Sequence, residues 1–159
     1  MDTTRPSTTA ARSEAPDGHQ LIAAGLEGHG ITHVFAIGGT PIHETLAACL
    51  RHGIRVVGVH NQQAAAMMAA SYNYMTGRLS AAVILSAGPA IANSVTGLLV
   101  AHDNDWPLLV IGGCRPLDMR GRGAFQDLDA VPIVESITRF AARLDRPEEI
   151  VPALDRACR

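Results

Sequence analysis

Lysine is absent from this chain of 159 residues, and all 13 of its basic residues are arginine. Without lysine, the chain has no residue for a Schiff base and cannot build the phosphate-binding loop that ends in GK[ST]. The arginines are offset by 15 acidic residues, which gives a net charge of −2. Because no basic stretch is interleaved with aromatic residues, we expect no nucleic-acid binding.

Cysteine and long apolar stretches are also scarce. Cys49, Cys114 and Cys158 lie far apart and form no CxxC pair, which argues against a disulfide framework or a zinc site and favours a reducing cytoplasm. The seven histidines include no HExxH motif, so we expect no metal held by this chain alone. No apolar run approaches the roughly 20 residues that cross a bilayer, and residues 1–16 lack the apolar core of a secretory signal.

The rest of the sequence alternates short apolar runs with helical patterns. Residues 1–16 are rich in Ser, Thr, Ala and Pro and predict a disordered tail, followed by one domain over 17–159. Predicted strands cover 32–37, 55–60, 80–86 and 107–113, with a further strand at 136–144. Predicted helices cover 18–29, 41–52, 62–77, 88–102 and 147–158, and a long loop covers 114–130.

This order of elements predicts the fold class. Strands that alternate with helices indicate a three-layer α/β fold, with a mostly parallel sheet and helices on both faces. The runs VVGV, AAVIL and LLVI agree, because strands buried on both faces show no polar alternation. Thr40 followed by Pro41 predicts a capped start for the helix over 41–52.

The predicted strand ends carry glycine and polar residues. Ligands of open parallel sheets bind beyond the carboxyl ends of the strands, and these ends fall at 37–40, 60–63, 86–89 and 112–114. Glycine there permits close approach of a ligand to the backbone, although turn geometry alone also requires it. None of the four segments completes GxGxxG, so taken one at a time they identify no reaction.

Four longer segments, taken together, resemble a known family in order and spacing. Residues 29–40 (HGITHVFAIGGT) resemble "GV..VFGIPGG", and residues 56–77 resemble "RHEQGAA..AEGYAR.TG". Residues 84–113 resemble "TSGPGATN...G...A..D..PLL.I.G", and residues 121–129 (GRGAFQDLD) resemble "G..AFQE.D". The chain thus resembles, over 18–159, the pyrimidine-binding (PYR) domain of thiamine diphosphate enzymes of the acetolactate synthase and 2-oxo-acid decarboxylase superfamily.

The resemblance implies a shared site. In the family the PYR domain supplies half of it, and a pyrophosphate-binding (PP) domain holds the diphosphate through Mg²⁺ with a GDG…N motif. This sequence contains no GDG. The resemblance therefore implies thiamine diphosphate bound between two chains, Mg²⁺ held by a separate PP-domain subunit, and a hetero-oligomer. The Ala- and Met-rich helix from Gln62 to Met75 is the expected interface.

The position at which the family has its activating glutamate carries a different residue in this chain. In the family this glutamate hydrogen-bonds N1′ of the aminopyrimidine and starts cofactor activation. Counting back from Gly77, this position falls on Gln62, which the resemblance makes a candidate catalytic residue. A glutamine amide donates a hydrogen bond but cannot exchange a proton, so the change argues against standard activation without excluding catalysis.

Further site residues follow from the resemblance. Gly38 stands where the family usually has proline, and Phe125 fits interface packing as well as a site role. Gln126 is a second candidate catalytic residue, and with Phe125 it would face the substrate. The candidate cofactor-binding residues are Ile37, Gly38, Gly39, Gln62, Pro89 and Asn93.

The resemblance leaves more than one function open. It implies an enzyme subunit that decarboxylates a 2-oxo acid or transfers the resulting acyl unit. The alternatives are a non-catalytic regulatory or pairing subunit, marked by Gln62, and an unrelated α/β binder of a small molecule. Family members continue into a strand resembling "GPV.L.IP", whereas this sequence ends at Arg159. We therefore expect that the sheet lacks that edge strand, that a partner covers the edge, or that the gene product is shortened.

Overall fold

The computed structural model describes residues 16–159. The tail expected over 1–16 lies, except for its last residue, outside the described residues. A four-stranded parallel sheet in the order β2-β1-β3-β4 forms the middle of the described part. Its strands are β1 (His33–Ala36), β2 (Arg55–Gly58), β3 (Ala81–Leu85) and β4 (Leu109–Gly112). Every residue of β3 is buried, as expected for a strand covered on both faces.

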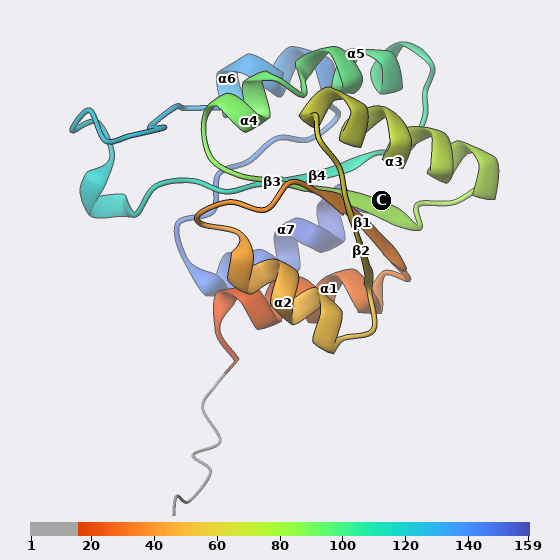
Figure 1. The fold of residues 1–159 in the computed structure, drawn as a ribbon, viewed down its shortest axis with the longest axis horizontal. Helices are drawn as coiled ribbons and strands as arrows, with labels where there is room; N and C mark the ends of the chain where they lie inside the picture. Colours follow the sequence, from red (N-terminus) through yellow and green to blue (C-terminus); the bar gives the residue numbers. More distant parts are fainter. Residues whose placement is uncertain (1–15) are drawn as a thin grey trace, which may run out of the picture.

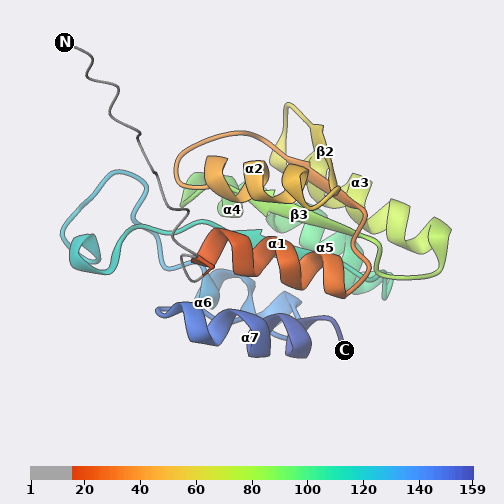
Figure 2. The ribbon, with the colours of Figure 1, turned by 90° about the horizontal axis from the view of Figure 1, so that it is seen from below.

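Helices cover both faces of the sheet (Figures 1 and 2). One face carries α3 (Gln62–Thr76), α4 (Pro89–Ala92), α5 (Val95–Asp103) and α6 (Val131–Val134). The other carries α1 (Gly18–Gly28), α2 (His43–Arg51) and α7 (Ile150–Ala157). Short 3₁₀ turns lie at η1 (Leu117–Met119), η2 (Glu135–Ile137) and η3 (Pro147–Glu149). The predicted three-layer α/β fold is confirmed.

Local capping explains where the best-predicted helices begin and end. The Asp17 side chain accepts a hydrogen bond from the Gln20 backbone at the start of α1. The Asn61 side chain does the same for the Ala64 backbone at the start of α3. Gly77 ends α3 with a φ of 68°, the left-handed conformation that glycine adopts without steric cost. These caps fix the position of Gln62 at the first turn of α3.

Two predicted helices differ from the structure. The helix expected from Pro41 begins at His43, and Thr40 does not cap it, since Ile42 is the cap residue and no side chain caps the helix. The helix expected over 88–102 is divided into α4 and α5. The break follows from the hydroxyl of Ser94, which donates to the Ile91 carbonyl at 2.7 Å and competes with helical backbone bonding.

The strand predicted at 136–144 is wrong. This segment begins in η2 and continues without regular structure, and among the described residues β4 pairs only with β3. The apolar pattern of the segment reflects packing rather than pairing, because the ring of Phe140 lies 4.6 Å from the guanidinium carbon of Arg156 on α7. A strand needs a hydrogen-bonding partner, and sequence periodicity does not supply one.

The outer edge of β4 borders a large cavity. Its volume is about 940 Å³, and its lining includes Leu109 and Ile111 of β4, Ala153 of α7 and Arg143 of the irregular segment. We refer to it as the β4 cavity. Elsewhere the core is dense, with α3 packed closely on α5. No helix among residues 16–159 is both long enough and apolar enough to cross a lipid bilayer.

Candidate functional site

A polar cleft lies at the carboxyl ends of the strands, on the left of Figure 1, where β1, β3 and β4 give way to loops. We call it the strand-end cleft, and its volume is about 710 Å³. All the site residues named from the sequence line it, although they come from four separate segments. The lining residues are Ile37, Gly38, Gly39, Thr40, Gln62, Ser86, Pro89, Ala90, Asn93, Arg115, Phe125 and Gln126.

The turns after β1 and β3 lie against each other at one side of the cleft. The Ser86 hydroxyl, just beyond β3, donates to the Thr40 carbonyl at 2.7 Å. A Cβ added at Gly39 would lie 3.2 Å from the Ser86 hydroxyl oxygen, a contact closer than most side chains tolerate. Glycine at 39 therefore lets the two turns approach, which places Ile37 and Pro89 on the same cleft.

The side-chain amides of Gln62 and Asn93 form a hydrogen-bonded pair at the N-terminal end of α3. The Asn93 side-chain nitrogen donates to the Gln62 Oε1 atom at 2.6 Å. This bond occupies one lone pair of the Gln62 amide oxygen, and the NH₂ group of Gln62 can donate to a ligand. The cleft thus presents the NH₂ group of Gln62 as a hydrogen-bond donor.

The distant loop that carries Phe125 and Gln126 is held by backbone contact. Gly88 has a φ of 58°, and a Cβ there would lie 2.7 Å from the Gln126 carbonyl oxygen. Gln126 itself has a φ of 63°, which is uncommon for a residue with a side chain. Only glycine at 88 meets both requirements, so the turn before α4 positions this loop across the cleft.

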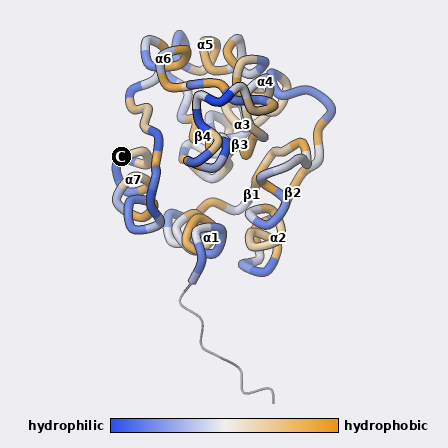
Figure 3. Tube along the Cα trace, turned by 90° about the vertical axis from the view of Figure 1, so that its left-hand side faces the viewer, coloured by the Kyte–Doolittle hydropathy of each residue, from blue (hydrophilic) through white to orange (hydrophobic). Residues whose placement is uncertain are grey.

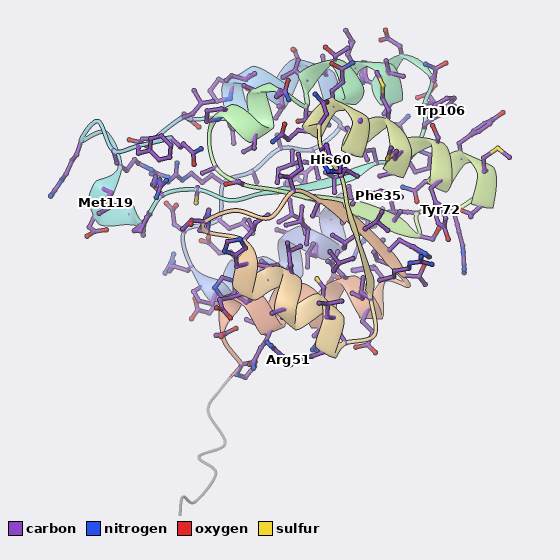
Figure 4. All side chains as sticks on the ribbon, viewed as in Figure 1. Phe35, Arg51, His60, Tyr72, Trp106 and Met119 are labelled. Carbon is purple, nitrogen blue, oxygen red and sulfur yellow. The ribbon has the colours of Figure 1, made fainter. Side chains whose placement is uncertain are left out.

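Phe125 is 77% exposed although it is a large apolar residue. Among the described residues it is therefore outside the core, and its interface or substrate role stays a prediction. Figure 4 labels Met119 in the short 3₁₀ turn η1 of the same loop, on the left of the view and away from α3 and α5. Figure 3, which looks onto the loops from this side, shows largely hydrophilic chain in front of β3 and β4.

Arg115 is the cleft residue that the sequence interpretation missed. Its Nη2 atom donates to the Gln126 Oε1 atom at 3.4 Å, and its guanidinium carbon lies 5.7 Å from the centre of the Phe125 ring. Its Nε atom is buried and has no hydrogen-bond partner. Arg115 directly follows residues 112–114, which the sequence analysis identified as the end of a predicted strand. Extending that strand-end segment by one residue would have included it.

The cleft has no acidic lining residue within the part of the chain that the structure describes. Likewise, no group of three or more His, Cys, Asp or Glu side chains over 16–159 is arranged to hold a metal ion. Cys114 lines the β4 cavity instead of the strand-end cleft. The cleft can therefore bind neutral or anionic groups through amide, guanidinium and backbone donors.

Comparison with known proteins identifies the family. The model of the family described as "Thiamine pyrophosphate enzyme, N-terminal TPP binding domain" matches residues 16–133. The chain belongs to this family. It is therefore a domain of the thiamine pyrophosphate (thiamine diphosphate) enzymes, and the resemblance drawn from its four sequence segments is confirmed.

Curated relatives of this thiamine pyrophosphate enzyme domain include 2-hydroxyacyl-CoA lyases and acetolactate synthases. Human 2-hydroxyacyl-CoA lyase 1 is 34% identical over 96% of this chain, which covers 26% of the relative. A probable acetolactate synthase of Mycobacterium bovis is 33% identical over 95% of this chain, which covers 27% of that relative. The 2-hydroxyacyl-CoA lyase of Arabidopsis thaliana is 33% identical over 88% of the chain and 24% of its own length. The chain thus spans about a quarter of these relatives.

Proposed function

We propose that this chain is the PYR half of a two-component thiamine diphosphate enzyme that acts on a 2-oxo acid in the cytoplasm. It would decarboxylate the acid or transfer the resulting acyl unit, together with a separate PP-domain subunit that holds Mg²⁺ and the diphosphate. The observation that carries the proposal is the convergence of Ile37, Gly38, Gln62 and Asn93 on one cleft from separate turns.

The residues present fit the pyrimidine end of the cofactor and not its diphosphate end. The Gln62 NH₂ group is free to donate to a ring nitrogen while Asn93 holds the amide oxygen. The small residues at 38 and 39 leave the cleft open beside it. The metal and the diphosphate site would come from the partner subunit.

Thiamine diphosphate supplies the carbon nucleophile that adds to a carbonyl group. This chain's part is to orient the aminopyrimidine from Gln62 and to close one wall of the cleft with Phe125 and Gln126. Because an amide does not ionise, Gln62 binds and orients but moves no proton. Gln62 therefore supplies no proton-transfer group, which predicts slow turnover for the natural sequence.

The second candidate is a non-catalytic regulatory or pairing subunit, which the same Gln62 supports. Calorimetric titration of thiamine diphosphate and Mg²⁺, into the chain alone and then with a PP-type partner, tests the shared site. Binding confined to the mixture supports it, whereas no binding in either case contradicts both the shared site and the enzyme. Turnover is then measured with a 2-oxo acid, the substrate class proposed here, and with a 2-hydroxyacyl-CoA, the compound in the name of one relative.

Substitutions at position 62 separate the two candidates. For the enzyme we expect Gln62→Glu to raise turnover by about 10²-fold or more, since a positioned proton-transfer group contributes roughly 10²–10⁴-fold. We expect Gln62→Ala to abolish turnover, while Gln63→Ala, one position along the helix and outside the cleft, leaves it within about 2-fold. If cofactor and partner bind but neither the natural chain nor Gln62→Glu consumes substrate, the pairing subunit is the correct function.

A further inference from the structure

Arg115 differs from the other arginine whose buried atoms lack partners. Arg143 also has buried Nε and Nη2 atoms without hydrogen bonds. Its charge is nevertheless balanced, because the Asp145 Oδ1 atom lies 3.5 Å from its Nε atom. For Arg115 no carboxylate of residues 16–159 lies within 4.0 Å. Of the two, Arg115 is the one whose charge is left unbalanced.

The contacts that Arg115 does make are weak. The bond from Nη2 to Gln126 Oε1 is 3.4 Å long, beyond the usual 2.7–3.2 Å range of N–H···O hydrogen bonds. The buried Nε–H has no acceptor, so it has given up its hydrogen bonds to water without replacing them. The Phe125 ring, 5.7 Å from the guanidinium carbon and 77% exposed, shields the cation without neutralising it. The Nε–Nη2 edge of Arg115 therefore lacks a strong anionic acceptor.

A small carboxylate matches this edge. Two oxygens of one carboxylate accept in parallel from the Nε–H and Nη2–H of an arginine, and such charge-assisted pairs are roughly twice as strong as neutral hydrogen bonds. One entering oxygen would replace Gln126 Oε1 at Nη2, and the second would accept from the buried Nε once the groups that cover it move aside. The absence of acidic lining residues leaves no competing anion from the described chain in the cleft.

We propose that Arg115 binds the carboxylate of the substrate and so selects a 2-oxo acid over a 2-hydroxyacyl-CoA. The inference deepens the proposed function and rests on it for the identity of the substrate. A 2-oxo acid carries its carboxylate directly beside the reacting carbonyl, whereas the corresponding end of an acyl thioester is uncharged. An arginine without a carboxylate partner at that place favours binding of an anion. If a neutral acyl group binds instead, the buried charge of the arginine stays unbalanced.

The test uses the chain of 159 residues with its natural sequence and oxamate, an unreactive analogue of a 2-oxo acid. Oxamate is titrated while the Arg115 Nε–Hε signal is followed by ¹H–¹⁵N NMR, with oxamide as the uncharged isostere and sodium chloride at matched ionic strength. We expect a saturable shift with oxamate at a Kd of about 1–10 mM, as for a few hydrogen bonds to one charge. No saturable shift, or equal shifts with oxamide or chloride, would overturn the proposal.

Variants assign the effect to the side chain. Arg115→Gln should weaken oxamate binding by about 10-fold, and Arg115→Lys, which keeps the charge but not the two-donor edge, by an intermediate factor. Arg122→Gln is the matched control, because Arg122 lies exposed in the same loop and outside the cleft. An equal loss with Arg122→Gln would show a general charge effect and contradict the assignment.

The two proposals fail separately. The oxamate titration contains no cofactor, partner or turnover, so binding through Arg115 stands even if the complete complex proves inactive. Conversely, an active complex that consumes a 2-hydroxyacyl-CoA as readily as a 2-oxo acid, and equally well with Arg115→Gln, would keep the enzyme function and overturn the role of Arg115.

Discussion

The contact between α3 and α5 and the outer edge of β4 are packed in opposite ways. A Cβ added at Gly97 of α5 would lie 2.6 Å from the Ala66 Cβ and 2.8 Å from the Gln63 carbonyl oxygen of α3. The edge of β4 instead borders a cavity of about 940 Å³. The tight contact holds the first turn of α3, and hence Gln62, in place. The site thus lies beside the tightly packed contact between α3 and α5. The outer edge of β4, in contrast, has no strand partner among the described residues.

Asn73 joins these two regions. Its buried side chain donates to the carbonyls of Ala81 and Pro107, each at 2.9 Å, and accepts from the backbone nitrogens of Ser80 and Ala81. The bonds connect α3 to the starts of β3 and of the segment leading into β4. The side-chain amide of Asn73 thereby positions the tightly packed helix α3 relative to β3 and β4.

The largest expected effect comes from removing this amide. Asn73→Ala leaves buried backbone groups without partners, at about 1–3 kcal/mol each, so we expect the free energy of unfolding to fall by about 4 kcal/mol. Denaturant unfolding followed by circular dichroism measures it. Asn104→Ala is the control, since its exposed side chain makes one bond to the Val100 carbonyl; a loss no greater than that of the control would refute the role of Asn73.

A matched pair of enlargements tests the difference in packing directly. Ala66→Leu has no room beside Gly97 and should lower the free energy of unfolding by about 1–3 kcal/mol. Ala153→Leu projects from α7 at the wall of the β4 cavity and should raise it by about 0.5–2 kcal/mol. The free energies of unfolding of both variants are compared by thermal unfolding. Destabilisation of similar size in both would show that the β4 cavity cannot accommodate the larger side chain.

The smallest effect concerns the reactivity of the thiols, with no change in stability. Burial raises the pKa of Cys49 to about 11, and burial together with Asp155 raises the pKa of Cys158, which lines the β4 cavity. Because the thiolate is the reactive form, a raised pKa slows alkylation at neutral pH and lets it accelerate as pH rises. Cys114 is exposed.

We therefore expect iodoacetamide to modify Cys114 first, Cys158 more slowly, and the fully buried Cys49 only after unfolding. Peptide mass spectrometry at increasing times and at pH values from neutral to alkaline gives the order. Early modification of Cys49 in the native protein would mean that the α2 side of the core opens more readily than the β4 edge.

Local patterns were sufficient for most of the elements. The apolar runs at 55–60 and 80–86 contain β2 and β3, and Asn61 and Gly77 bound α3 because a cap and a left-handed glycine act within a few residues. The errors occurred where distant contacts decide. The segment 136–144 has the composition of a strand but no partner, and the course of the chain near Thr40 is set by a bond from Ser86.

The sequence by itself determined the α/β fold and, through four ordered segments, the family and the residues that line the strand-end cleft. Only the tertiary structure decided how those residues are used. The amide of Gln62 is oriented by Asn93, which is remote in sequence, and the loop of Gln126 is held by the absence of a Cβ at Gly88. Arg115 became a candidate because its charge is unbalanced in space. Such neighbours are created by folding, so no local spacing in the sequence encodes them.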